Sequence, residues 1–152
     1  MKLRCVDCIL AWEPWRTIRG VKAVSFEEYC LPAGLGLPEH LPAALALESV
    51  FELARWLAVL SSDFQQIALP IELEHCTFTR PLRPGERMQI DLVAQPPAQG
   101  EFVFSAQART RTAEVLLVRV ARARLWPLAD HVNPDDLRVL YSEIHRPDAV
   151  PT

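Results

Sequence analysis

Two glutamates and an arginine are the side chains whose spacing most suggests shared chemistry in this chain. Glu48, Glu52 and Arg55 follow one another at intervals of four and three residues, so on a helix they would form one narrow stripe. Two carboxylates one turn apart raise the pKa of one of them, and a carboxyl with a raised pKa can act as a general acid near neutral pH. Arg55 could equally neutralise the pair, which leaves an ordinary solvated stripe as the alternative.

A base and a nucleophile are less obvious in the sequence. His40 lies shortly before the stripe, and histidine side chains titrate near neutral pH, which suits proton transfer. The alternative for His40 is a surface position at a helix start. Cys30 could act as a nucleophile with a base beside it, but the sequence offers no evident base, and a packed thiol is the alternative. The remaining histidines are expected in a strand or in the C-terminal segment: His75, His131 and His145.

The cysteines do not form a recognisable metal site. Cys5 and Cys8 make a C-x-x-C, but no second pair of ligands follows at a matching spacing. If this segment is a strand, the two side chains also point to opposite faces. We therefore expect packed thiols, no bound metal and no cofactor.

Composition and charge predict a folded domain and exclude several functions. The chain has 152 residues, of which 50% are hydrophobic and 23% charged, enough to bury a core. Its net charge is −3 with no compensating basic stripe, so nucleic-acid binding is not expected. The apolar run 41–60 contains three charged side chains and is a poor membrane span. The N-terminus lacks the pattern of a signal peptide, so we expect a cytoplasmic location.

Hydrophobic periodicity predicts six strands and one long helix. Residues 42–60 begin with proline and are apolar nearly all round, which is typical of a buried helix. Alternation of apolar and polar residues in the strands favours an antiparallel sheet with one covered side. The expected strands are 5–12, 17–24, 67–79, 87–94, 101–109 and 115–125. An α+β architecture, with one antiparallel sheet wrapped round the helix, accommodates this order.

Two segments depart from regular structure. Residues 30–42 are rich in proline and glycine and are expected to be an irregular loop. In the last strand, 115–125, the alternation changes phase, which a bulge or an edge position would explain. Residues 127–152 are expected to form a C-terminal tail with a short helix at 134–144.

Four segments together resemble the hot-dog-fold 3-hydroxyacyl-acyl-carrier-protein dehydratases of the FabZ and FabA type. Residues 6–25 are similar to the opening hairpin of that family, and 41–58 (LPAALALESVFELARWLA) to its central helix. Residues 76–92 (CTFTRPLRPGERMQIDL) are similar to its Phe-x-Arg-Pro-Val-x-Pro-Gly-Asp stretch, and 102–123 to its closing strands. The resemblance implies a hot-dog domain over residues 1–126.

The resemblance also implies an activity and its catalytic residues. The family dehydrates 3-hydroxyacyl thioesters, a lyase reaction of fatty-acid or polyketide-type metabolism, on acyl-carrier protein or coenzyme A. Its helix acid lies six residues after the helix proline, which here is Glu48. Its loop histidine lies eight residues before that proline, and a count without gaps places Gly34 there. The usual base is thus absent from its expected position, and His40 and Cys30 are the candidates to replace it.

An acyl pocket beside Glu48 is implied as well. Backbone N–H groups of the loop and of the helix N-terminus would hold the thioester oxygen there. In the family this pocket lies at a homodimer interface, where one chain offers the loop and the other the acid. The expected substrate-binding residues are Gly34, Leu35, Gly36, Leu37, Leu41, Phe51 and Glu52.

Three functions remain open from the sequence. The chain could be a dehydratase with an unidentified base, or a hot-dog thioesterase that uses the helix carboxylate and a water. It could also be an acyl-thioester-binding subunit without catalysis, which pairs with a partner that carries the histidine. Arg119, Arg122 and Arg124 could dock an acidic acyl-carrier protein, or could be the ordinary charges of an edge strand.

Overall fold

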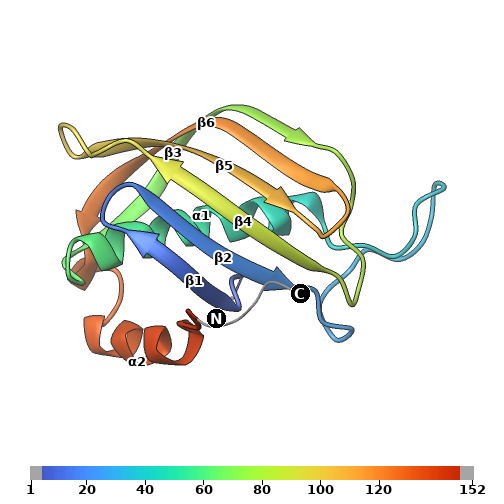
Figure 1. The fold of residues 1–152 in the computed structure, drawn as a ribbon, viewed down its shortest axis with the longest axis horizontal. Coiled ribbons are helices and arrows are strands. Elements are labelled where there is room, and N and C mark those ends of the chain that lie inside the picture. Colours follow the sequence, from blue (N-terminus) through green and yellow to red (C-terminus); the bar gives the residue numbers. More distant parts are fainter. Residues whose placement is uncertain (1–4, 148–152) are drawn as a thin grey trace.

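One antiparallel sheet curves around a long helix in the computed structural model, which describes residues 5–147 (Figure 1). The strands are β1 (Cys8–Glu13), β2 (Thr17–Ala23), β3 (Gln66–Phe78), β4 (Arg87–Ala94), β5 (Glu101–Arg109) and β6 (Glu114–Pro127). The helices are α1 (Ala43–Ser61) and α2 (Pro134–Ile144), with a short 3-10 helix, η1 (Leu128–Asp130), between β6 and α2. The six strands lie in the order β1-β2-β4-β5-β6-β3. Both helices and all six strands agree with the predicted ranges to within a few residues.

Helix α1 is positioned by its apolar residues against the inner face of the sheet. Pro42 precedes its first turn, and Val50, Leu53 and Leu57 are completely buried. The first turn is more open than the sequence suggested, since Ala43 and Ala44 are exposed. The helix N-terminus is therefore accessible to a ligand, whereas the C-terminal half belongs to the core.

The sheet explains the change of phase in the last strand. β6 lies between β5 and β3, so it is not an edge strand. Its pairing with both neighbours shifts register at bulges, and such bulges move side chains from one face to the other. The sequence offered two explanations for the change of phase, of which the bulge is confirmed and the edge position is wrong. Arg119, Arg122 and Arg124 therefore lie on an internal strand.

Within the described part of the chain, strand β3 has one unpaired side and a partly uncovered inner face. Leu73 pairs with Ala121 and Phe78 with Leu116, and both partners on β6 are buried in the core. Leu73 and Phe78 therefore continue the core-facing side of the sheet, but they remain 37% and 42% exposed. The structure leaves an apolar strip at this edge of the sheet.

The opposite edge is contacted by the C-terminal residues. Trp12 of β1 donates from Nε1 to the hydroxyl of Tyr141 on α2, over 3.1 Å. Farther on, the N–H of Arg146 donates to the carbonyl oxygen of Ile9, over 2.9 Å. Figure 1 shows α2 lying beside β1. Within residues 5–147, neither helix is long and apolar enough to cross a membrane.

Gly20 on β2 lies where the sheet and α1 approach closely. A Cβ at this position would come within 2.8 Å of Leu53 Cδ1 and 3.0 Å of the carbonyl oxygen of Cys8. Gly20→Ala should therefore lower the free energy of unfolding by about 1–3 kcal/mol through overpacking. Gly34→Ala, where nothing lies within 4 Å of the added carbon, is the control. Equal midpoints in urea for the two variants would contradict this close approach.

Candidate functional site

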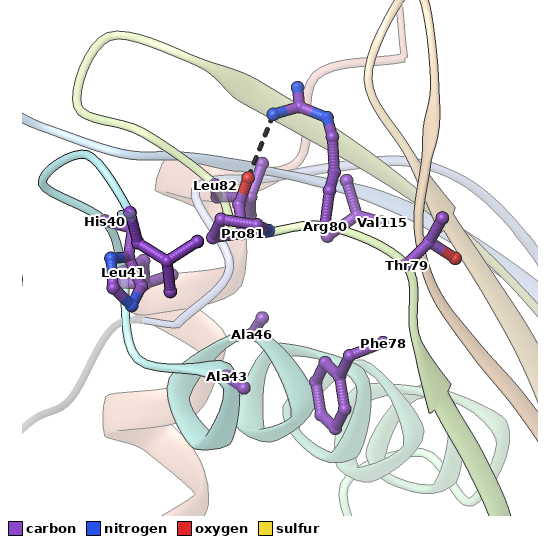
Figure 2. Close-up of a pocket in the computed structure, with 11 residues that line it drawn as sticks. His40, Leu41, Ala43, Ala46, Phe78, Thr79, Arg80, Pro81, Leu82 and Val115 are labelled. Carbon is purple, nitrogen blue, oxygen red and sulfur yellow. Dashed lines mark hydrogen bonds between the residues drawn. The ribbon is translucent and has the colours of Figure 1, made fainter. Parts of the chain in front are cut away.

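A cavity of about 260 Å³ opens at the N-terminal end of α1 (Figure 2). Its walls come from three segments that are distant in sequence: the chain leading into α1 with the first turns of α1, the end of β3 with the residues that follow it, and the start of β6. The lining side chains are mainly apolar, with one imidazole and one guanidinium among them. They are Leu37, His40, Leu41, Ala43, Ala46, Phe78, Thr79, Arg80, Pro81, Leu82 and Val115.

Residues 31–40, which we call the arm, form a small hairpin where the sequence predicted an irregular loop. The backbones of Leu31 and His40 bond to each other in both directions, and so do those of Gly34 and Leu37. Leu35 and Gly36 both have positive φ, of 50° and 78°, which makes a two-residue hairpin turn. The side chain of Leu35 is fully exposed at the tip. The base of the arm, in contrast, lies against the cavity.

His40 stands at that base with its ring fixed. Its Nδ1 lies 2.8 Å from the carbonyl oxygen of Pro38. A carbonyl only accepts, so this contact assigns the proton to Nδ1 and leaves Nε2 of the neutral ring as a proton acceptor. The next residue, Leu41, donates its N–H to the carbonyl oxygen of Leu82 over 2.7 Å. The imidazole of His40 is thus half-buried, and the residue that follows His40 is hydrogen-bonded to the cavity wall.

The helix N-terminus adds polar groups to an otherwise apolar cavity. The first intrahelical bonds of α1 run from the N–H groups of Leu45 and Ala46 to the carbonyl oxygen of Pro42. The N–H groups of Ala43 and Ala44 come before these first bonds, so they have no acceptor within the helix. The side chain of Pro42 does not cap them either. Together with the helix dipole, such N–H groups favour an oxygen that gains negative charge.

Glu48 is not among the residues that line this cavity. Ala46 faces the cavity, and a residue two positions farther along a helix lies about 200° round the axis. The side chain of Glu48 is 34% exposed, and its Oε1 lies 2.7 Å from Nη1 of Arg55. The predicted stripe therefore exists, and Glu48 and Arg55 form an ion pair in it.

Glu52, in the same stripe, holds the N-terminal segment. Its Oε2 accepts the N–H of Cys5 over 2.8 Å. Burial has the largest effect and raises the pKa of Glu52 above its ordinary value, although the hydrogen bond from Cys5 and the charge of Arg55 act to lower it. Burial and the charges of Glu52 and Glu48 raise the pKa of the Cys5 thiol to about 11, so this thiol stays protonated at neutral pH. A partner 47 residues away could not be foreseen from local spacing.

The remaining sequence candidates are divided between the cavity and other places. Leu37 and Leu41 lie at the cavity, whereas Gly34, Leu35 and Gly36 lie in the outer part of the arm. Phe51 packs edge-on against Phe104, with ring centroids 6.5 Å apart.

Cys30 precedes the arm and is half-buried. Burial, with the charges of Glu39 and Glu28, raises its pKa, which does not activate a nucleophile. Among residues 5–147 no three histidine, cysteine or acidic side chains are grouped as a metal site.

Sequence reasoning missed the other wall of the cavity. Phe78, Thr79 and Val115 come from β3, its end and β6, and nothing in their local pattern points to a binding role. The Arg-Pro pair at residues 80–81 belongs to the stretch 76–92 that resembles the family, but on the sequence alone it indicates the end of a strand and not a binding role.

Solved structures with this architecture place the chain among the hot-dog-fold proteins. An acetyl-CoA-bound protein of Streptococcus mutans, smu.793, superposes with a TM-score of 0.64 at 8% identity, over 84% of this chain and 94% of that chain. A mutant of the fluoroacetyl-CoA-specific thioesterase FlK gives a TM-score of 0.62 at 10% identity, over 86% and 98%. The predicted fold is thereby confirmed.

Comparison with curated sequences identifies the family within the hot-dog-fold proteins. The dehydratase FabZ of Aliarcobacter butzleri is 32% identical over 101 residues, which are 60% of this chain and 67% of the relative. FabZ of Geobacter metallireducens is 28% identical over 109 residues, 68% of this chain and 71% of the relative. No protein-family model matches. The chain belongs to the 3-hydroxyacyl-[acyl-carrier-protein] dehydratase FabZ family, as its residues suggested.

Proposed function

We propose that the chain binds an acyl thioester in the cavity at the start of α1 and eliminates water from 3-hydroxyacyl thioesters, with His40 as the base. The observation that carries this proposal is the imidazole at the cavity, whose Nδ1 lies 2.8 Å from the Pro38 carbonyl oxygen. Nε2 of His40 accepts the proton from C2 of the substrate. The electrons of that C–H bond form the C2–C3 double bond, and the hydroxyl leaves C3 as water with a proton from an acid.

The rest of the cavity suits the same reaction. Proton removal from C2 places negative charge on the thioester oxygen, which the N–H groups of Ala43 and Ala44 can bind. Leu37, Leu41 and Phe78 offer apolar contacts for the acyl chain. The FabZ relatives support an acyl-carrier protein as the carrier of the substrate, and the acetyl-CoA-bound neighbour supports coenzyme A as an alternative.

The acid in this proposal is Glu48 of a second copy, which carries the proton at the leaving hydroxyl in place of its ion pair with Arg55. Glu48 faces away from the cavity of its own protomer, so an arrangement across a homodimer is needed to bring it to the substrate. The unpaired side of β3 and the exposed Leu73, Phe78 and Leu35 support such a pair, because each copy presents apolar surface that another copy can cover.

The activity is tested with a crotonyl thioester and the purified chain. We expect hydration, followed as loss of the enoyl absorbance, and a fall of about 10²-fold or more in Glu48→Gln, since one general acid contributes that much. Release of free thiol without hydration would instead favour a thioesterase, the activity named for several structural neighbours. Binding with neither product would contradict both enzymes and favour a binding subunit.

The homodimer is tested by light scattering at micromolar concentration. Wild-type protein should have twice the mass of one chain, and Leu73→Asp should be a monomer because it places a charge on the apolar strip of β3. Val139→Asp, on an apolar side chain of α2 that is 62% exposed, is the matched control and should remain a dimer. A wild-type monomer would contradict the proposed arrangement.

A further inference from the structure

Arg80 and Glu86 form a clasp across the turn that follows β3. Nη2 of Arg80 lies 2.6 Å from Oε1 of Glu86, and Nη1 lies 3.2 Å from Oε2. The same Nη1 donates to the carbonyl oxygen of Pro81 over 2.9 Å, which is the dashed line in Figure 2. Oε2 of Glu86 also accepts the N–H of Arg83 over 2.8 Å. Such a bidentate pair fixes geometry more firmly than a single contact.

The clasp fixes a cavity wall. Arg80, Pro81 and Leu82 all line the cavity, and the carbonyl of Leu82 receives the N–H of Leu41. Leu41 directly follows His40, so this hydrogen bond ties the segment 80–82 to the residue next to His40. The wall is held at its other end as well, because Val24 and Glu86 are joined by a backbone hydrogen bond of 2.9 Å.

The guanidinium is committed to this clasp. Burial alone would raise the pKa of Glu86, but its hydrogen bonds with Arg80 and with the N–H of Arg83 lower it below its ordinary value. Both nitrogens at the end of the Arg80 side chain are engaged by Glu86, and one of them also by Pro81. Its charge is already neutralised, so a role in shaping the cavity fits better than a role in binding an anionic ligand.

We propose that Arg80 is a positioning residue: through the Glu86 clasp and the Leu82–Leu41 hydrogen bond it holds His40 at the cavity. Its effect on catalysis rests on the function proposed above. Its effect on the backbone does not, and the two can be measured separately.

The experiment compares Arg80→Met and Arg80→Lys with Arg124→Met. Arg124 is the matched control, since its Nη2 also lies 2.6 Å from a glutamate oxygen, Oε1 of Glu101, on the β5–β6 pair. The first readout is amide hydrogen exchange at Leu41. Loss of the clasp should accelerate it about tenfold or more in Arg80→Met, less in Arg80→Lys, and not at all in Arg124→Met.

The second readout is crotonyl-thioester hydration. A displaced base costs rate more than binding, so kcat should fall about 10- to 100-fold in Arg80→Met, with a smaller change in KM and partial recovery in Arg80→Lys. Unchanged Leu41 exchange in a folded Arg80→Met would overturn the proposal. Faster exchange with no activity even in wild type would overturn the proposed function and leave the positioning role standing. If Arg80→Met does not fold, amide exchange at Leu41 is measured in Arg80→Lys and Glu86→Gln instead. Faster exchange in these variants supports the positioning role, and unchanged exchange overturns it.

Discussion

Replacing His40 with alanine should reduce hydration of a crotonyl thioester by about 10²- to 10⁴-fold, the range that a general base contributes. The imidazole lies at the cavity, and its Nδ1 contact with the Pro38 carbonyl orients the ring and leaves Nε2 to accept a proton. The ring is not part of the buried core, so His40→Ala should keep the unfolding midpoint of the wild type. Steady-state rates at matched protein concentration measure the effect.

Two further variants make this test specific. His131→Ala removes an exposed imidazole beyond β6 and should leave the rate unchanged. Gly34→His restores histidine at the position that a count without gaps assigns to the base, but Gly34 lies in the outer part of the arm with nothing within 4 Å of an added Cβ. We expect no gain from it. A tenfold gain with Gly34→His, or a fully active His40→Ala, would show that another residue is the base.

Phe104→Ala should lower the free energy of unfolding by about 3–5 kcal/mol, the usual cost of truncating a buried phenylalanine. The side chain is 2% exposed and packs on Phe102, with centroids 5.7 Å apart, and edge-on against Phe51 of α1. Its cross-strand partners are both alanines, Ala94 and Ala121. These small side chains cannot fill the space left by the ring, so most of the cavity would persist.

Urea unfolding followed by fluorescence measures this loss. Val139→Ala, at an exposed position of α2, should change the free energy of unfolding by no more than about 0.5 kcal/mol. A loss below about 1 kcal/mol for Phe104→Ala would mean that the sheet and α1 repack around the gap, against the close packing expected of protein interiors.

The sequence was sufficient to predict the secondary structure because its signals are local. Alternation along residues 87–94 and 101–109 marks two strands with one buried face, and Pro42 followed by an apolar run marks the start of α1. The bulges of β6 were visible as a change of phase. Which strand would lie at the edge was not visible, because strand order depends on contacts between distant segments.

The site was only partly predictable for the same reason. His40, Leu37 and Leu41 were found because they adjoin the start of α1, while Phe78 and Val115 reach the cavity only through the pairing of β3 with β6. The count that led to Gly34 assumed a loop without structure of its own. The hairpin turn at Leu35 and Gly36 instead carries Gly34 outward and leaves His40 at the base.

The contact of the C-terminal residues with β1 has a consequence for how large an assembly can become. A sheet that is open on both sides can add one molecule after another, which leads to fibres. Here Arg146 already bonds to Ile9 on the outer side of β1, and α2 lies beside that strand. A second molecule can therefore extend the sheet by strand pairing only at the β3 edge. Among residues 5–147, β3 is the edge that lacks such a contact, so in the proposed homodimer strand addition would stop after two molecules.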